Sequence, residues 1–119
     1  MPGPALVAAC HCGQATIRLP RPPDYVNRCN CSLCLKSGWQ GIYYASDELE
    51  IAGEFDSYVR TDIEQPMIRI LRCANCGVGT HWAPLGPPPY QRMGVNARLV
   101  DPALLEGVEV RDVDGASWA

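Results

Sequence analysis

The sequence is poor in lysine and carries no excess of positive charge. Its 119 residues include 10 Lys+Arg, of which Lys36 is the sole lysine, against 13 Asp+Glu, and the formal net charge is −3. Proteins that bind nucleic acid through its phosphate backbone normally present a basic surface. The charge balance therefore argues against a nucleic-acid partner.

Long hydrophobic runs are also missing. The longest stretch without a charged side chain, from Cys73 to Gln91, contains four prolines and a histidine, so it is not a membrane span. The opening residues, MPGPALVAAC, have neither the basic start nor the full apolar segment of a secretory signal. We therefore expect a cytoplasmic protein with no membrane partner.

Uninterrupted helical patterns are absent as well. The 11 glycines and 11 prolines are spread along the chain, where they break long helices. The residues of Ala15–Leu19 instead alternate between apolar and polar, which is typical of a half-buried strand. Only Ser32–Ser37 reads as a helical turn. Further strands are predicted at Gly41–Ala45, Leu49–Ile51, Phe55–Arg60, Met67–Arg72, Arg92–Leu99 and Val108–Val110.

These short strands indicate an all-β fold. No linker, repeat or low-complexity tract divides the chain, so residues 1–119 are expected to form a single domain. A small β domain rich in glycine and proline has a modest hydrophobic core, and such domains often need a metal ion for stability.

Cysteine is what the sequence does have in quantity. Seven cysteines cannot all pair in intramolecular disulfides, and a reducing cytosol disfavours disulfides in any case. Cysteines one or two residues apart can reach one zinc ion from a single tight turn. The seven fall into three such groups, namely Cys10 and Cys12, then Cys29, Cys31 and Cys34, then Cys73 and Cys76.

Seven ligands divide naturally into four and three. Neither pair can complete a tetrahedral zinc site alone, so the two pairs predict one structural site, here called the quartet, made of Cys10, Cys12, Cys73 and Cys76. The remaining group predicts a second zinc ion whose fourth position is open, as in catalytic sites. This second group is called the triplet and consists of Cys29, Cys31 and Cys34.

Two alternatives stay open for the triplet. A histidine can supply the fourth ligand and convert it into a second structural site, and His81 is the first candidate for that ligand. His11 lies between two cysteines of the quartet and is a weaker candidate. The three thiols can also form a reduced cluster without metal.

An open zinc site with three thiolates favours thiol chemistry. Its electron-rich shell acidifies bound water less than three neutral histidines do, and the soft ion prefers an incoming thiol. Coordination deprotonates that thiol and makes it a nucleophile or a leaving group. Cations beside the site would offset the added negative charge, and Arg28 and Lys36 adjoin the triplet in sequence.

The cysteine motifs resemble those of a known family in order and spacing. The segments C-H-C-G, C-N-C-S-x-C and C-x-x-C-G begin at Cys10, Cys29 and Cys73. They are similar to the glutathione-dependent formaldehyde-activating enzyme family, which shares its domain with centromere protein V. The resemblance covers nearly the whole chain, because it extends to Thr80-His81, Met93–Asn96 and Asp114-Gly115.

The resemblance implies a β-tent fold, in which small antiparallel sheets pack around zinc knuckles. It implies two zinc ions per chain, a structural one in the quartet and a catalytic one in the triplet. It also implies the condensation of formaldehyde with glutathione to S-hydroxymethylglutathione, which is a carbon–sulfur lyase activity. The expected small-molecule partners are a thiol such as glutathione and a small aldehyde.

Two other functions are compatible with the same cysteines. A non-catalytic zinc-binding module would use its metal sites to support contact with another protein. A thiol redox sensor would use Cys73 and Cys76, although their surroundings lack the βαβ pattern of thioredoxin-like proteins. Two zinc ions of which one is exchangeable would favour the lyase, whereas one tightly held ion without thiol binding would favour the module.

Overall fold

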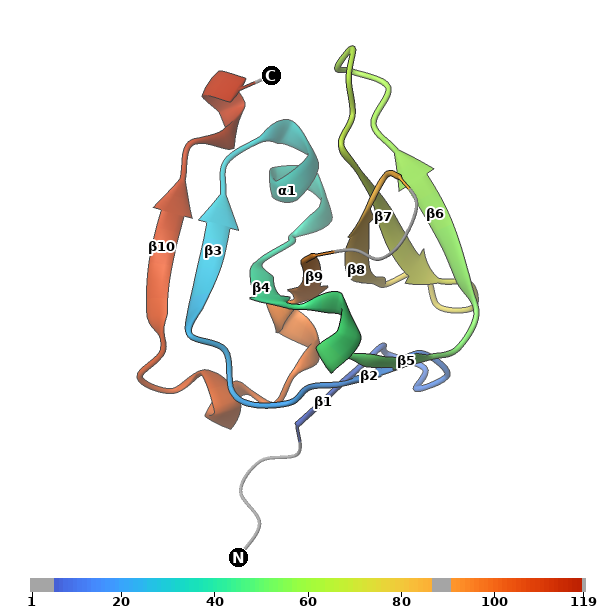
Figure 1. Cartoon of the computed structure of the whole chain (residues 1–119), viewed down its shortest axis with the longest axis vertical. Coiled ribbons are helices and arrows are strands. Elements are labelled where there is room, and N and C mark those ends of the chain that lie inside the picture. Colours follow the sequence, from blue (N-terminus) through green and yellow to red (C-terminus); the bar gives the residue numbers. More distant parts are fainter. Residues whose placement is uncertain (1–5, 87–90, 119) are drawn as a thin grey trace, which may run out of the picture.

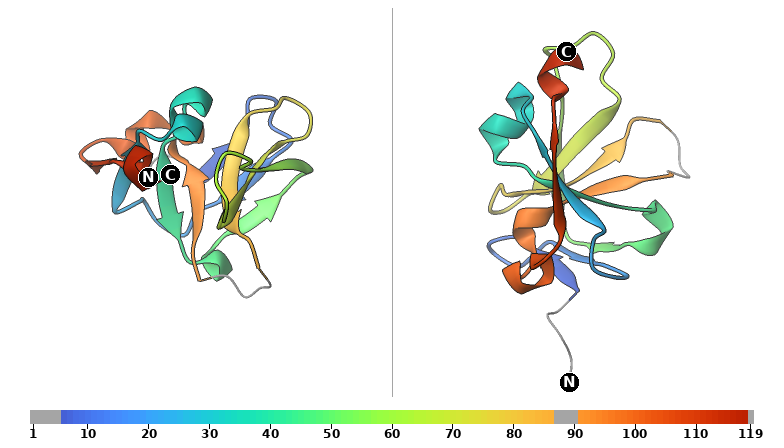
Figure 2. Two further views of the ribbon diagram at one scale, coloured as in Figure 1. Left: turned by 90° about the horizontal axis from the view of Figure 1, so that it is seen from above. Right: turned by 90° about the vertical axis from the view of Figure 1, so that its left-hand side faces the viewer.

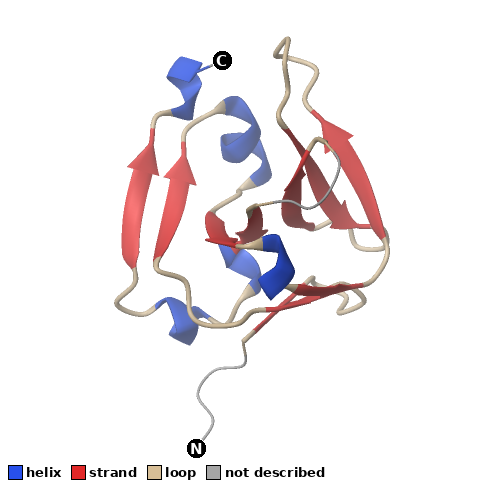
Figure 3. Ribbon diagram, in the orientation of Figure 1, coloured by secondary structure: helices blue, strands red, loops and turns tan. Residues whose placement is uncertain are grey.

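Strands make up most of the regular structure in the computed structural model, which describes residues 6–86 and 91–118 (Figures 1 and 3). The strands are β1 Val7–Ala9, β2 Thr16–Arg18, β3 Tyr25–Cys29, β4 Gly41–Tyr44, β5 Glu50–Ala52, β6 Phe55–Val59, β7 Ile68–Cys73, β8 Gly79–Pro84, β9 Met93–Asn96 and β10 Glu109–Val113. The α-helix is α1 Ser32–Ser37, and the 3₁₀ turns are η1 Ser46–Glu48, η2 Ala97–Leu99, η3 Pro102–Leu105 and η4 Gly115–Trp118. The prediction of an all-β fold is confirmed.

The strands form two sheets. The smaller has the order β1-β2-β5, and the larger has the order β10-β3-β4-β9-β8-β7-β6. All neighbours pair antiparallel except β10 and β3, which run parallel in a register from Glu109 opposite Tyr25 to Val113 opposite Cys29. The parallel pair departs from the expected antiparallel pattern. It arises because the chain passes through η2 and η3 to the lower end of β3 before β10 begins (Figure 1).

Strands with clear alternation were predictable, and those without it were not. Each of the seven predicted strand segments overlaps a strand, and the helical turn at Ser32–Ser37 has the predicted bounds. The segment Arg92–Leu99 is extended only as far as Asn96, because the Asn96 side chain accepts a hydrogen bond from the Arg98 amide at 3.1 Å and begins η2. The strands that the sequence pattern missed are β1, β3 and β8.

The main core lies where the small sheet meets the larger one. Ile17 of β2, Ile42 of β4 and Val95 of β9 are almost completely buried there. The strands of the larger sheet turn strongly relative to one another (Figure 2), as expected from the right-handed twist of β-strands. The twist leaves the end of β3 and α1 at one end of the molecule, away from the small sheet (Figure 1).

No helix within the described part of the chain is long and apolar enough to cross a membrane.

Candidate metal centres

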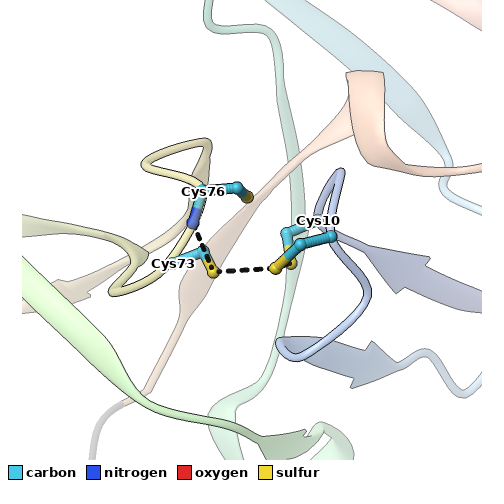
Figure 4. A group of neighbouring side chains, drawn as sticks. Cys10, Cys73 and Cys76 are labelled. Carbon is cyan, nitrogen blue, oxygen red and sulfur yellow. Dashed lines mark hydrogen bonds between the residues drawn. The ribbon is translucent and has the colours of Figure 1, made fainter.

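The quartet is assembled from two turns that are far apart in sequence. Cys10 and Cys12 lie in the β1–β2 turn, and Cys73 and Cys76 begin the β7–β8 turn. Figure 4 shows the side chains of Cys10, Cys73 and Cys76 directed toward one another from these turns. All four sulfur atoms lie within 4.8 Å of one another.

The sulfur spacing in the quartet fits a zinc ion. The Sγ atoms of Cys10 and Cys12 are 3.7 Å apart, and those of Cys12 and Cys73 are 3.6 Å apart. A tetrahedral ion with Zn–S bonds of about 2.3 Å places its sulfur ligands about 3.8 Å from one another. These two spacings match those between the sulfur ligands of a tetrahedral zinc ion.

A glycine allows each of the two turns to close tightly. Gly13 and Gly77 have φ angles of 84° and 79°, in the left-handed region that glycine adopts most readily. The Gly13 amide donates to the Cys10 carbonyl at 3.1 Å, and the Gly77 amide donates to the Cys73 carbonyl at 3.0 Å. The C-x-C-G motif thus closes a turn between residues three apart, and the C-x-x-C-G motif closes one between residues four apart.

Amide hydrogens stabilise the thiolate form of Cys73, which is 1% exposed. Its Sγ accepts from the backbone amides of Asn75 and Cys76, both at 3.3 Å, and from the side-chain amide of Gln14 at 3.0 Å. Burial alone would raise the pKa of Cys73, but these hydrogen bonds outweigh it and lower the pKa to about 6. A thiol that ionises below neutral pH is well suited to bind zinc.

The triplet is local, because its three cysteines lie between the last residue of β3 and the first turn of α1. Cys31 is the N-cap of α1, and its Sγ accepts from the Cys34 amide at 3.4 Å. The Cys31 amide in turn points at the Cys29 Sγ, also at 3.4 Å. The three sulfur atoms lie within 4.8 Å of one another, so one ion can contact all of them.

An open pocket of about 460 Å³ adjoins the triplet. Cys29 and Cys34 line it, together with the buried Trp39. Asp112 and Asp114, from the end of β10 and just beyond, also face the pocket. Three thiols beside an open pocket provide space for an additional ligand.

The two cations predicted beside the triplet lie in different settings. Arg28 lines the pocket, and its guanidinium binds the Asp112 carboxylate through hydrogen bonds of 3.0 and 3.2 Å. Lys36 is exposed in the last turn of α1 and is not among the residues that line this pocket.

Arg60 lies close enough to the triplet to influence the Cys31 thiol, and sequence reasoning missed it. Its guanidinium binds the Asp62 carboxylate at 2.9 and 2.6 Å, and Asp62 also accepts from the Ser32 hydroxyl at 3.5 Å. Burial raises the pKa of Cys31, but the Cys34 amide, the neighbouring thiols and Arg60 together lower it. Because Ser32 and Asp62 are 30 residues apart, no local spacing indicates this contact.

The chain after β10 closes one side of the triplet. The Asn30 side-chain amide donates to Asp114 at 2.9 Å, and its oxygen accepts from the Ala116 amide at 2.9 Å. These bonds place Gly115 directly against the Cys29 sulfur, where a Cβ atom would overlap with that sulfur. The triplet thus depends on a segment more than 80 residues away, since Asn30 and Asp114 are 84 residues apart.

The two histidines belong to neither cysteine cluster. His81 is 3% exposed, its Nδ1 lies 2.8 Å from the Thr80 hydroxyl, and its ring packs edge-on against Phe55. Burial, together with Arg69, lowers the pKa of His81 to about 4. His11 is exposed in the first cysteine turn. In the described residues, both clusters consist of cysteines alone.

Comparison with known proteins agrees with this arrangement. The family model described as "Glutathione-dependent formaldehyde-activating enzyme" matches residues 5–103. The chain belongs to this family. The matched residues include all seven cysteines of this chain, whereas β10 and Asp114 lie beyond the matched range.

A solved structure supports the fold. The crystal structure of a Rhodobacter sphaeroides protein superimposes on this chain with a TM-score of 0.66 and 25% sequence identity. The similarity covers 88% of this chain and 99% of that chain. Among curated proteins, no match to this chain was found.

Proposed function

We propose that this member of the family is a zinc-dependent enzyme of the carbon–sulfur lyase type. Its substrate would be a thiol–aldehyde adduct, as for S-(hydroxymethyl)glutathione synthase. The observation that carries the proposal is a cluster of three thiols beside a 460 Å³ pocket, in a chain that belongs to a formaldehyde-activating family. The free state of all seven cysteines is compatible with the cytoplasm as its compartment.

The two clusters would have different roles. The quartet has four thiols for a tetrahedral ion and would hold a structural zinc, whereas the triplet has three and would hold a catalytic zinc. Zinc bound at the triplet supplies an open position that accepts a thiol and favours its deprotonation. Residues 1–119 would then form a single domain with two zinc ions.

The residues around the triplet are arranged to hold a thiolate. The Cys29, Cys31 and Cys34 side chains come from one short segment, so they define a single ligand position relative to the pocket. Arg60 provides positive charge on the Cys31 side, which offsets the negative charge that an additional thiolate brings. A substrate thiol entering from the pocket would meet the Cys29 and Cys34 side.

The condensation is balanced without an oxidant or reductant. The thiol sulfur forms a bond with the carbonyl carbon of formaldehyde, and the π bond of the carbonyl breaks. The thiol proton is released, and the carbonyl oxygen takes up a proton to become the hydroxyl of the product. In the reverse direction the carbon–sulfur bond breaks and the thiolate leaves.

Cobalt substitution tests the proposal directly. Glutathione added to the cobalt protein should intensify the sulfur-to-metal charge-transfer band, because a further thiolate enters the coordination shell. S-methylglutathione is the matched control and should leave the band unchanged, since a thioether has no proton to lose and is a poor ligand. The response should disappear in Cys31→Ser. If glutathione and other small thiols have no effect at millimolar concentration, the protein is better described as a non-catalytic zinc-binding module for protein interaction.

A further inference from the structure

Residues 114–117, here called the terminal turn, lie against the triplet where the pairing of β3 with β10 ends. Val113 is opposite Cys29 in the parallel register, and the Asn30 amide donates to the Val113 carbonyl at 3.1 Å, which continues the pairing by one residue. The terminal turn follows at once, at the end of the molecule that carries α1 (Figure 1). The family model stops at residue 103, before this turn.

The side chain of Asn30 holds the terminal turn with both ends of its amide. Its nitrogen donates to the Asp114 carboxylate, and its oxygen accepts from the Ala116 amide, both at 2.9 Å. Ser117 closes the turn internally, because its amide and its hydroxyl donate to the Asp114 carbonyl at 3.3 and 2.9 Å. Asn30 is bonded in the chain to two cysteines of the triplet, so the residue that holds the turn lies between two of the three thiols.

The backbone of the terminal turn packs directly on the triplet. Gly115 is buried, and a Cβ atom there would overlap with the Cys29 sulfur and lie 3.4 Å from the Cβ of Cys31. The turn therefore covers these two cysteines from the β10 side. Opening of the turn uncovers the Cys29 sulfur, and a shift of that sulfur pushes against the turn.

The bonds that close the turn are weak one by one. Asn30, Asp114 and Ala116 are exposed, and a solvent-exposed hydrogen bond adds little net stability. Segments held in this way open locally without unfolding of the whole protein. An ion bound to Cys29 and Cys31 fixes the backbone on both sides of Asn30, which reduces the entropy lost when its side chain is held against the turn.

We propose that closure of the terminal turn is coupled to metal binding at the triplet, with Asn30 as the positioning residue that couples them. This inference rests on the part of the proposed function that gives the triplet a metal ion. Such coupling is reciprocal, so an ion that favours the closed turn is also bound more tightly when the turn is closed. The turn thereby slows loss of the ion from the triplet.

Hydrogen exchange at the Ala116 amide measures closure of the turn, because this amide donates to Asn30. Wild type is compared when fully loaded with zinc and after mild chelation that removes the triplet ion alone. Removal should speed exchange at Ala116 about fivefold, as expected for two exposed hydrogen bonds. The Leu104 amide, which donates to the Asp101 carbonyl, is the control and should not change. Equal exchange at Ala116 in the two states overturns the proposal.

Zinc release to a chromophoric chelator gives the reciprocal measurement. Asn30→Ala removes both side-chain bonds to the turn and should speed release of the triplet ion about fivefold, with release from the quartet unchanged. Asn27→Ala is the matched control, because Asn27 is in β3 as well and its amide donates to the Tyr43 hydroxyl instead. It should change release of the triplet ion less than about twofold.

An exchange of two side chains separates positioning from a general loss of stability. Asn30→Asp combined with Asp114→Asn keeps the net charge and reverses the direction of the hydrogen bond between the two positions. The carboxylate then at position 30 can still accept from the Ala116 amide. This double variant should release zinc at the wild-type rate. Release as fast as in Asn30→Ala would instead show that the contact with the turn does not control the ion.

These measurements do not depend on turnover, so the two proposals can fail separately. Coupling in a protein that binds no thiol supports the role of the terminal turn and overturns the lyase proposal. Thiol binding with equal zinc release from wild type and Asn30→Ala overturns the coupling and leaves the lyase proposal standing. A wild-type protein with no releasable triplet ion overturns both.

Discussion

The two cysteine clusters use the same side chain in different structural contexts. The quartet joins two turns, and Cys12 and Cys73, whose sulfurs are 3.6 Å apart, are separated by 61 residues. The triplet is confined to the short segment from Cys29 to Cys34. A bound ion in the quartet therefore closes a long loop, whereas one in the triplet organises a single turn.

This difference predicts that the quartet contributes to folding stability and that the triplet serves ligand chemistry. Closing a long loop restricts the unfolded chain, and metal binding that requires the native arrangement adds its free energy to folding. The quartet adjoins a small satellite core in which Ala15 and Phe55 pack against Cys10 and Cys73. The triplet borders an open pocket and the partly buried Arg60 instead. We infer that the quartet stabilises the fold and that the triplet is free to serve a ligand.

The largest expected effect is the loss of the quartet. Cys73→Ser removes a ligand that is 1% exposed, and structural zinc can contribute about 10 kcal/mol or more to the folding of small domains. The variant should be insoluble or unfolded, as judged by circular dichroism and thermal denaturation. A soluble Cys73→Ser protein with an unchanged Tm would contradict the structural role.

Acid should destabilise the protein through His81, independently of the triplet. The pKa of His81 is lowered from 6.5 to about 4 by burial and Arg69, so between these values the unfolded state binds more protons than the folded state. The contribution of His81 to the free energy of unfolding is therefore fully present above pH 6.5. It falls by about 3 kcal/mol as the pH drops to 4.

Denaturant unfolding across this pH range, compared with His81→Gln, checks the prediction. The variant should lose the part of the acid sensitivity that comes from the imidazole and should keep the zinc content of wild type at neutral pH. Loss of one zinc ion from His81→Gln would instead identify this histidine as the fourth ligand of the triplet ion.

The triplet should lose its metal without unfolding. Cys31→Ser should bind about one zinc ion fewer per chain than wild type, because only the β3–α1 turn depends on that ion. Its Tm should change far less than that of Cys73→Ser. Metal analysis before and after mild chelation measures this, and wild type should release its triplet zinc first. Unfolding as severe as in Cys73→Ser would remove the distinction between the clusters.

The smallest expected effect concerns Arg60. Arg60→Gln removes the positive charge next to Cys31 and should weaken zinc binding at the triplet about threefold to tenfold, since each tenfold change corresponds to about 1.4 kcal/mol. Competition with a chromophoric chelator measures the affinity. Arg28→Gln is the matched control, because Arg28 is exposed and already paired with Asp112, and it should change the affinity less than twofold.

Sequence reasoning was most successful where the relevant information was local. The bounds of α1 follow from Cys31 at its N-cap and Gly38, with a φ of 71°, at its C-terminal end. Alternation predicted β2, and aromatic and β-branched residues predicted β4, because period-two patterns and these residue types favour strands. β3 was missed because its sequence, Tyr-Val-Asn-Arg-Cys, does not alternate between apolar and polar residues.

The sequence by itself determined which cysteines share a turn and how the seven divide between two clusters. Whether two cysteines of one tight turn can bind the same ion depends only on their spacing, and protein zinc sites use three or four protein ligands. Only the tertiary structure decided what surrounds those sites. Arg60, Asp114 and Gly115 meet the triplet because the sheets bring β6 and β10 to its sides. Contacts between residues so far apart depend on strand order and direction, which the local pattern of side chains does not encode.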